Sequence, residues 1–228
     1  MRKRSRKYKA SFDKLDNSRS YGTSTVVKQL RDCRENKFDE MVDLAFKLGI
    51  DPKQAAQQIR GSFSLPHGTG KTRKVIVFAM GDKAIEAREN GADEVGSDEL
   101  VKKIQDGWLD FDVAISTPEM MGVVGKLGRM LGPQGKMPSP KSGTVTDHIA
   151  NTVKEFKSGK IEYRNDSGGN LHAPIGKLSF TDDQLQENIA AFMDHVTSLK
   201  PSSSKGQFIQ SASLSSTMSP SIKLAISE

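Results

Sequence analysis

Apolar residues in the first part of the chain follow two different periodicities. Residues 23–35 have them at helical spacing, whereas residues 38–50 alternate apolar and polar positions as a half-buried strand does. Asp51-Pro52 then predicts a helix N-terminus before residues 53–60, with a short strand to follow. This region therefore predicts a helix and then a strand, helix, strand unit.

The middle of the chain alternates buried strands with helices. The apolar runs KVIVFAM and DVAIST each lead into a helical pattern, the second of which begins at Thr117-Pro118. A glycine- and proline-rich loop at residues 131–146 precedes an amphipathic helix that ends at Gly159. Strands that alternate with helices in this way predict a wound α/β domain with a parallel sheet.

The last third of the chain returns to short strands. Residues 161–166 and 171–180 predict two strands joined by a tight turn, and residues 181–200 predict a capped amphipathic helix. Alternating strand patterns on both sides of SSTMSP, residues 215–220, complete the region. An α/β segment between two regions of unlike periodicity predicts a discontinuous outer domain with an inserted inner domain.

Two chain crossings are expected between these domains. The outer domain comprises residues 17–67 plus 160–228, the inner domain comprises residues 68–159, and a basic arm of residues 1–16 precedes both. Because glycine changes its dihedral angles at little steric cost, the crossings predict a hinge. Its expected residues are His67, Gly68, Gly70 and Gly159.

The net charge of +6 is concentrated at the start of the chain. The arm contains seven Lys/Arg and two Asp/Glu, so the remainder of the chain is nearly neutral. A nearly neutral body cannot bind a nucleic acid through bulk charge. It must instead use its shape and individually placed contacts.

The sequence lacks the marks of several other protein classes. No apolar run approaches the ~20 residues of a membrane-spanning helix, and no apolar signal segment follows the basic N-terminus, so we expect a cytoplasmic protein. The single cysteine, Cys33, and the scattered histidines match no metal-binding spacing, so we expect neither a metal nor another cofactor. No Ser/His/Asp or Cys/His set has local support, so we expect no enzyme.

The segment LPHGTGKT, residues 65–72, is the feature that favours an enzyme. It is similar to a phosphate-binding loop, but Leu65 stands at the position of the first glycine. A strand also follows the segment, whereas a phosphate-binding loop opens a helix. A nucleotide- or small-molecule-binding enzyme that uses the inner domain is therefore the alternative function.

Two short segments combine side chains that suit RNA. Arg164, Asn165 and Asp166 place a guanidinium, an amide and a carboxylate at a predicted turn, where the alternative is a solvated turn with a local ion pair. Lys37 and Phe38 supply a cation and a ring that can pack on a ribose or a base. Their alternative role is to start the core strand.

Hydroxyl groups and lysines provide further candidate contacts. An almost uncharged, hydroxyl-rich segment near the end of the chain can contact the shallow minor groove of RNA at close range. The alternative is an ordinary polar loop. The candidate residues are Ser211, Ser213, Thr217, Met218 and Ser219. The inner domain adds possible secondary contacts to phosphates, with a plain surface loop as the alternative. These residues are Lys126, Arg129, Lys136 and Lys141.

Four collinear blocks of the sequence resemble the bacterial L-one (L1) family of large-subunit ribosomal proteins. They begin KFDEMVDLAFKLG, LGRMLGPQGKMPS, IEYRNDSGGNLHA and KGQFIQSASLSST, and together they extend over nearly the whole chain. The resemblance implies an α/β fold. It consists of an α+β outer domain made from both chain ends, an inserted Rossmann-like three-layer α/β domain, and a two-crossing hinge.

The resemblance also implies a function in translation. Members of the family are structural constituents of the large ribosomal subunit that bind the ribosomal RNA stalk next to the exit site and assist release of deacylated tRNA. They commonly repress translation of their own operon by binding a messenger structure that mimics the ribosomal site. The expected partners of a protein that is monomeric off the ribosome are therefore ribosomal RNA, exit-site tRNA and own-operon mRNA.

The family's RNA-contacting positions correspond here to Lys37, Phe38, Arg164, Asp166, Ser211, Thr217 and Met218. This chain departs from the family pattern at Ser219 and Ser221, where glycine is usual, and at Met41, where threonine is usual. In the inner domain, Gln134 and Lys136 replace a usual arginine and leucine. A serine at a position that requires a positive φ costs roughly 1 kcal/mol unless the loop adjusts.

Overall fold

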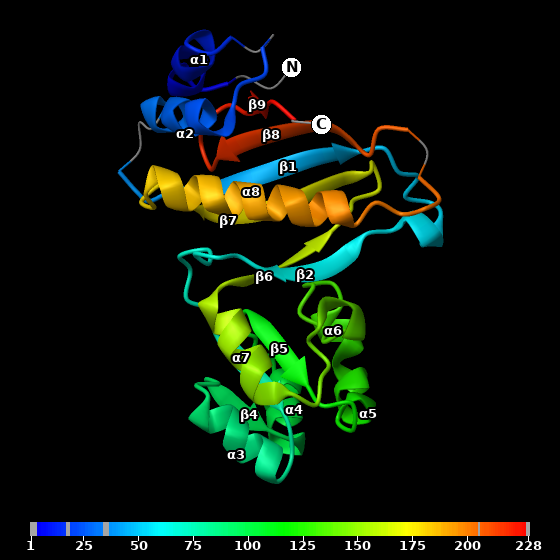
Figure 1. The fold of residues 1–228 in the computed structure, drawn as a ribbon. Helices are drawn as coiled ribbons and strands as arrows, with labels where there is room; N and C mark the ends of the chain where they lie inside the picture. Colours follow the sequence, from blue (N-terminus) through cyan, green and yellow to red (C-terminus); the bar gives the residue numbers. More distant parts are fainter. Residues whose placement is uncertain (1–3, 17–18, 34–36, 205, 227–228) are drawn as a thin grey trace. The chain divides into compact units, whose positions relative to one another are not determined.

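The computed structural model describes residues 4–16, 19–33, 37–204 and 206–226. Its mixture of helices and strands confirms the expected α/β class. The chain forms two compact units: an outer unit, Met1–Gly70 with Ile161–Glu228, and an inserted unit, Lys71–Lys160 (Figure 1). The hinge expected between them stays a prediction.

Four antiparallel strands form the main sheet of the outer unit, in the order β7-β1-β8-β9. β1 (Met41–Leu48) lies between β7 (Asn170–Lys177) and β8 (Ile209–Ser216), and β9 (Ile222–Leu224) pairs with β8. The strand predicted within residues 38–50 is confirmed, as are the strands on both sides of the SSTMSP segment. The two ends of the chain therefore meet in one sheet.

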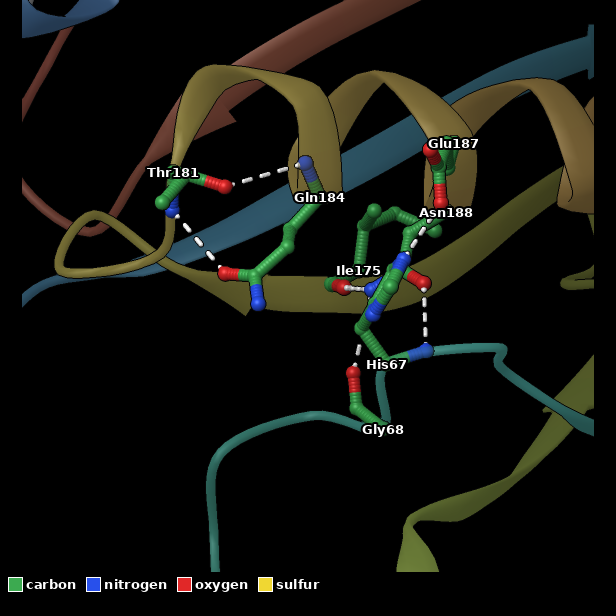
Figure 2. A network of polar contacts seen from close by, with 7 residues as sticks. All are labelled: His67, Gly68, Ile175, Thr181, Gln184, Glu187 and Asn188. Carbon is green, nitrogen blue, oxygen red and sulfur yellow. Dashed lines mark hydrogen bonds and ion pairs between the residues drawn. The ribbon is translucent and has the colours of Figure 1, made fainter.

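Two helices, α2 (Thr23–Asp32) and α8 (Asp182–Ser198), pack on one face of this sheet. The apolar positions of β1 predicted to be buried are the ones that face them: Val42, Leu44, Phe46 and Leu48. Both predicted helices are confirmed, although residues 34 and 35 of the first lie outside the described residues. α8 starts with a capping box, in which Thr181 and Gln184 exchange hydrogen bonds (Figure 2).

The helix expected over residues 53–60 is wrong. The chain instead forms turns and one 3-10 turn, η1 (Ala55–Gln57), before the predicted short strand, β2 (Arg60–Ser64). The Asp51 carboxylate accepts a hydrogen bond from the Lys53 N–H at 3.1 Å. Local side-chain bonds of this kind compete with the helical backbone pattern, so a good N-cap signal is followed here by a single turn.

The two strands predicted around the Ser-Gly-Gly-Asn turn exist, but they do not form the expected hairpin. β6 (Lys160–Arg164) pairs with β2 in a separate two-stranded sheet, whereas β7 joins the four-stranded sheet. A single antiparallel bridge, between Asn165 and Leu171, connects the two strands. The turn thus links two sheets, because β6 pairs with β2 while β7 pairs with β1.

The basic arm contains a helix that the sequence interpretation missed, α1 (Arg6–Asp13). The Ser5 hydroxyl caps it by accepting a hydrogen bond from the Tyr8 N–H at 3.2 Å. Tyr8, Phe12 and Leu15 follow helical spacing, and Leu15 packs against the core of the outer unit. This apolar stripe was the available signal, but the surrounding basic residues obscured it.

A parallel three-stranded sheet, in the order β4-β3-β5, forms the centre of the inserted unit. Its strands are β3 (Val75–Phe78), β4 (Glu94–Gly96) and β5 (Val113–Ser116). The two predicted buried strands are therefore confirmed as parallel neighbours. β4 was not predicted, because three residues carry too little pattern.

Helices lie on both faces of this parallel sheet, which gives three layers. α3 (Asp82–Glu89) and α7 (Ile149–Ser158) share one apolar core with the sheet. The core on the other face includes α4 (Asp98–Gln105), α5 (Met121–Val124), η2 (Gly125–Leu127) and α6 (Gly128–Leu131). The loop that follows contains only the short η3 (Pro140–Ser142).

In the inserted unit, one predicted helix begins later than expected and another ends where predicted. The helix expected to begin at Thr117-Pro118 begins at Met121, after a turn. α7 ends as predicted at Gly159, whose φ of 111° lies in the left-handed region that favours glycine.

The crossing segment after β2 is fixed to α8 by a buried amide. Asn188 is fully buried; its Oδ1 accepts the His67 N–H at 3.0 Å, and its Nδ2 donates to Gly68 O at 3.1 Å and to Ile175 O at 2.9 Å (Figure 2). The His67 ring also contacts the Glu187 carboxylate at 2.5 Å. His67 and Gly68 therefore belong firmly to the outer unit, so a hinge in this segment would have to begin after Gly68.

Candidate RNA-binding surface

The sheet face opposite α2 and α8 carries polar side chains in a regular array. On β1, Lys47 lies between Asn170 of β7 and Ser211 of β8 in the register, and Ala45 lies beside Ser213. These positions alternate with the buried apolar ones and are half-buried or exposed. The sheet therefore brings the predicted hydroxyl groups of Ser211 and Ser213 onto one face with the Lys47 ammonium.

The loop after β8 is held against the start of β1 by a buried carboxylate. Glu40 is only 2% exposed, and its Oε2 accepts the Ser216 hydroxyl at 2.5 Å and the Met218 N–H at 3.2 Å. Thr217 adds a second link, because its N–H donates to Met41 O at 3.1 Å and its Oγ1 accepts the Met41 N–H at 3.2 Å. The backbone of this loop is therefore fixed in a defined position.

Phe38 and Met218 are large apolar side chains that this arrangement leaves in water. Phe38 is 50% exposed and Met218 is 57% exposed. Phe38 lies two residues before Glu40, and Glu40 binds the backbone of Met218, so both side chains belong to the same end of β1. Lys37 is exposed beside them. A fixed, exposed ring and thioether next to a cation can stack on a base or pack on a ribose.

Ser219 shows how this chain accommodates a residue at a usual glycine position. Its hydroxyl accepts the Ser216 N–H at 2.9 Å and donates to Pro220 O at 3.0 Å. No described non-glycine residue has a positive φ, so the backbone at Ser219 needs no glycine. The cost of roughly 1 kcal/mol expected for a strained serine therefore does not arise.

The turn after β6 is shaped by Asp166. Its carboxylate accepts the N–H groups of Gly168 at 2.8 Å and Asn170 at 2.7 Å, and the side-chain amide of Asn170 at 2.9 Å. The hydrogen bonds from Asn170 in particular hold the pKa of Asp166 below its ordinary value. Lys47 Nζ donates to Gly168 O at 2.5 Å, so the turn lies at the end of the array on β1.

The other two predicted residues of this turn differ in availability. Asn165 is used within the fold, because its Oδ1 accepts the Ile59 N–H at 2.8 Å and its own N–H donates to Ile59 O at 3.0 Å. Arg164 is exposed and forms no ion pair with any described residue, so the local ion pair considered from the sequence is not found there. Arg164 is therefore free to bind a phosphate or a base edge.

Of the four predicted secondary contacts in the inserted unit, three are exposed and one is bonded within the fold. Lys126, Arg129 and Lys141 are exposed. Lys136, in contrast, donates from Nζ to Leu109 O at 3.0 Å and lies 4.9 Å from the centroid of the Phe111 ring. Lys136 thus stabilises its own unit, which weakens its candidacy as a phosphate contact.

The carboxyl edge of the parallel sheet, where an α/β enzyme would bind a nucleotide, carries acidic residues. Asp82 stands in the first turn of α3, and Lys83 Nζ is paired with Asp147 at 2.7 Å and lies near Glu119. Residues 65–72 lead into β3 without opening a helix. Residues 65–72 therefore lack the strand-to-helix setting of a phosphate-binding loop.

No group of three or more His, Cys, Asp and Glu side chains in the described ranges is arranged to hold a metal ion. Within the same ranges, no helix is long and apolar enough to cross a membrane.

Three contributors to this surface were missed in the sequence: Glu40, Lys47 and Asn170. The sequence does indicate a role for Glu40. It stands two residues before buried Val42, so it should face the same side of the sheet, where a buried carboxylate needs a hydrogen-bond partner. Lys47 and Asn170 had no such signal, because only the pairing of β1 with β7 brings them together.

The candidate surface thus runs along β1 and β8 from the Asp166 turn to the Thr217–Ser219 loop, and the whole of it lies in the outer unit. A family model described as the ribosomal protein L1p/L10e family matches residues 28–220, which include the four blocks that carry the resemblance seen in the sequence. The chain therefore belongs to the ribosomal protein L1p/L10e family, whose members are structural, RNA-binding constituents of the large ribosomal subunit.

Proposed function

We propose that the outer unit binds the stalk of large-subunit ribosomal RNA next to the exit site, and that the protein thereby assists release of deacylated tRNA. The observation that carries this proposal is the fixed loop in which Glu40 holds the backbone of Met218 while the thioether stays exposed. A side chain that is held in water by a buried polar network is suited to contact a partner, because it contributes little to the protein's own core.

The chemistry of the surface supports a structured RNA as the partner. Hydroxyl groups and an ammonium along β1 and β8, with the carboxylate of the Asp166 turn, can exchange hydrogen bonds with ribose 2′-hydroxyls and base edges, which a DNA duplex does not offer in the same form. The body of the chain is nearly neutral, so such placed contacts have to supply the specificity.

Two further roles belong to the same proposal. The surface would also bind a messenger structure with the same shape, so the protein would repress translation of its own operon. The inserted unit would add weaker RNA contacts through Lys126, Arg129 and Lys141, and it would move about the hinge after Gly68.

The test is a titration of labelled stalk RNA with the wild-type chain and with Met218→Ala. We expect the variant to lose about 1 to 3 kcal/mol of binding free energy while its thermal unfolding stays nearly unchanged. Met80→Ala is the matched control, because Met80 is 61% exposed but lies in the inserted unit. Thr217→Ser serves as a milder variant that keeps the hydroxyl bonded to Met41.

Equal affinity of Met218→Ala and Met80→Ala for the RNA would remove the loop from the binding surface. A parallel titration with nucleotides tests the enzymatic alternative. Saturable nucleotide binding or turnover, together with no affinity of the wild type for stalk RNA, would contradict the proposed function as a whole.

A further inference from the structure

A polar groove opens where β1 ends, beside the surface described above. Its volume is about 670 Å³, and it is lined by Lys47, Leu48, Gly49, Ile50, Asp51, Gln207 and Gln210. Lys47 pairs with Ser211 in the sheet, and Gln210 is the neighbour of Ser211 in the chain. The groove therefore adjoins the candidate RNA-binding surface and extends it past Ser211, the nearest of the family's contact positions on β8.

Gly49, which lines the groove, has no room for a side chain. A Cβ atom there would lie 2.4 Å from Gln207 O, a backbone atom that cannot move aside cheaply. The Gly49 N–H donates to Phe208 O at 2.7 Å, and Gly49 O accepts the Ser204 hydroxyl at 2.9 Å. The φ of Gly49 is not in the left-handed region, so close backbone approach is what requires glycine here.

The side chains around the groove offer both donors and acceptors. Gln207 and Gln210 are exposed, and neither side-chain amide forms a hydrogen bond with a described residue. Asp51 accepts the Lys53 N–H at 3.1 Å and the Gln54 amide at 3.4 Å, which leaves lone pairs on its carboxylate that face no described donor. Each amide supplies one carbonyl acceptor and two N–H donors.

This mixture of donors and acceptors suits the base of a nucleotide better than its phosphate. A phosphate would gain from Lys47 but would be repelled by the Asp51 carboxylate. A nucleobase edge, in contrast, presents N–H donors and carbonyl or ring-nitrogen acceptors side by side, which an amide pair and a carboxylate can match. The half-buried Ile50 side chain adds an apolar contact for the face of a base.

We propose that this groove receives one unpaired nucleobase of the RNA that the outer unit binds, with Gln207 and Gln210 contacting the base edge. The inference rests on the proposed function, since it extends the same surface. It names two specificity-determining residues, and the base they contact is one that is unstacked and outside the paired stem.

The experiment is a double-mutant cycle between protein and RNA. Stalk RNA is prepared with each unpaired nucleotide replaced in turn by an abasic residue, and binding is measured for the wild type and for Gln207→Ala combined with Gln210→Ala. We expect one abasic position to weaken wild-type binding by about 10-fold and to have almost no effect on the double variant. Gln134→Ala, an exposed glutamine of the inserted unit, is the control and should behave like the wild type.

The outcomes separate this inference from the proposed function. If the wild type binds the RNA but every abasic change weakens the double variant as much as the wild type, the groove holds no base and the inference fails. If the wild type does not bind the stalk RNA, the proposed function itself fails. Added nucleoside monophosphates should not compete; saturable binding of a free nucleotide in the groove would overturn the assignment to RNA.

Unchanged thermal unfolding of the double variant is expected, because both glutamines are exposed. Should it unfold at a lower temperature, each single variant is measured with the same abasic series. The inference is supported if, for either single variant, the abasic position that weakens wild-type binding no longer weakens binding. It is contradicted if that position weakens binding of both single variants as much as that of the wild type.

Discussion

At the residue scale, a buried carboxylate controls the position of the exposed thioether. Glu40 accepts hydrogen bonds from the Ser216 hydroxyl and the Met218 N–H although it lies outside the surface that a partner can reach. A positioning role of this kind can be measured, since a change at Glu40 would alter binding without removing any group that touches RNA.

For Glu40→Gln we expect two effects with one cause. The amide keeps the shape but loses the negative charge, and hydrogen bonds to charged groups are stronger than those between neutral ones. The free energy of unfolding, measured with urea, should fall by about 1 to 2 kcal/mol, and the affinity for stalk RNA should fall as well. Glu119→Gln, at an exposed position of the inserted unit, is the control. A variant at position 40 that unfolds and binds like this control would rule out the positioning role.

A second residue, His195, links stability to pH. It packs against Phe63 with ring centroids 4.4 Å apart, and its Nε2 lies 2.7 Å from the Tyr163 hydroxyl. Burial lowers the pKa of His195 below its ordinary value of 6.5. As the pH falls below 6.5, the unfolded chain therefore takes up a proton before the folded chain does.

The stabilising contribution of neutral His195 should consequently be complete above pH 6.5 and decline below it, until the folded-state pKa is passed. Urea unfolding at about pH 7.5 and about pH 5.5 measures the decline, and His195→Gln should show less of it because glutamine does not titrate there. The same loss of stability in both proteins on acidification would mean that other groups cause it.

At the element scale, α8 both completes the core of the outer unit and anchors the first crossing. Its Asn188 binds the backbone of His67, Gly68 and Ile175 at once (Figure 2). A helix is a suitable support for this role, because its own backbone hydrogen bonds keep the amide in one place.

Asn188→Leu should therefore be strongly destabilising, although leucine suits a buried helical position. It removes the side-chain partner of three backbone groups, and each buried group left unsatisfied costs roughly 1 to 3 kcal/mol. We expect a loss of about 3 kcal/mol or more in the free energy of unfolding, and faster hydrogen exchange at the His67 amide. Asn188→Asp keeps the acceptor for His67 but sets a buried carboxyl oxygen against Gly68 O and Ile175 O, so it should also be strongly destabilising. A stable leucine variant with a protected His67 amide would contradict the anchoring role.

The elements also show where sequence patterns succeed. The alternation in β1 and the capping box of α8 are local signals, and both are found as predicted. The helix expected over residues 53–60 failed because Asp51 forms a local turn instead, and the expected hairpin failed because β6 pairs with β2 and β7 pairs with β1, in different sheets. Periodicity predicts that a strand exists, but it does not choose the neighbour of that strand.

At the scale of the whole molecule, charge and specificity are separated along the chain. The arm holds most of the net positive charge, and α1 displays part of it through Arg6, Lys7 and Lys9. The candidate surface combines hydroxyls, a turn carboxylate and exposed apolar groups with a few placed cations, namely Lys37, Lys47 and Arg164. Electrostatic attraction and recognition should therefore respond differently to salt and to mutation.

Replacing all three of these cations by glutamine, as Arg6→Gln, Lys7→Gln and Lys9→Gln, should weaken binding of stalk RNA only modestly at about 0.15 M salt. The dependence of affinity on salt should become shallower, by about 0.9 per phosphate contact that is lost. Lys154→Gln, an exposed cation of the inserted unit, is the control. Abolished binding in the triple variant would indicate nonspecific coating by the arm rather than recognition by the sheet.

The sequence by itself determined the α/β class, most of the helices and strands, and the family, because local hydrogen bonds and apolar periodicity are written in neighbouring residues. It also provided most of the candidate residues, although as separate segments. What it did not contain was the partner of each segment, since pairing between β1 and β8 joins residues that are far apart in the chain.

Only the tertiary structure therefore decided what these residues can do. Asn165, a candidate contact in the sequence, and Lys136, a possible secondary contact, are bonded within the fold, whereas Arg164 stays exposed. Glu40 gained a role because Met218, 178 positions later, comes within hydrogen-bonding distance of it. The physical reason is that a buried charge must find its partners wherever the folded chain brings them, and that position is not a local property of the sequence.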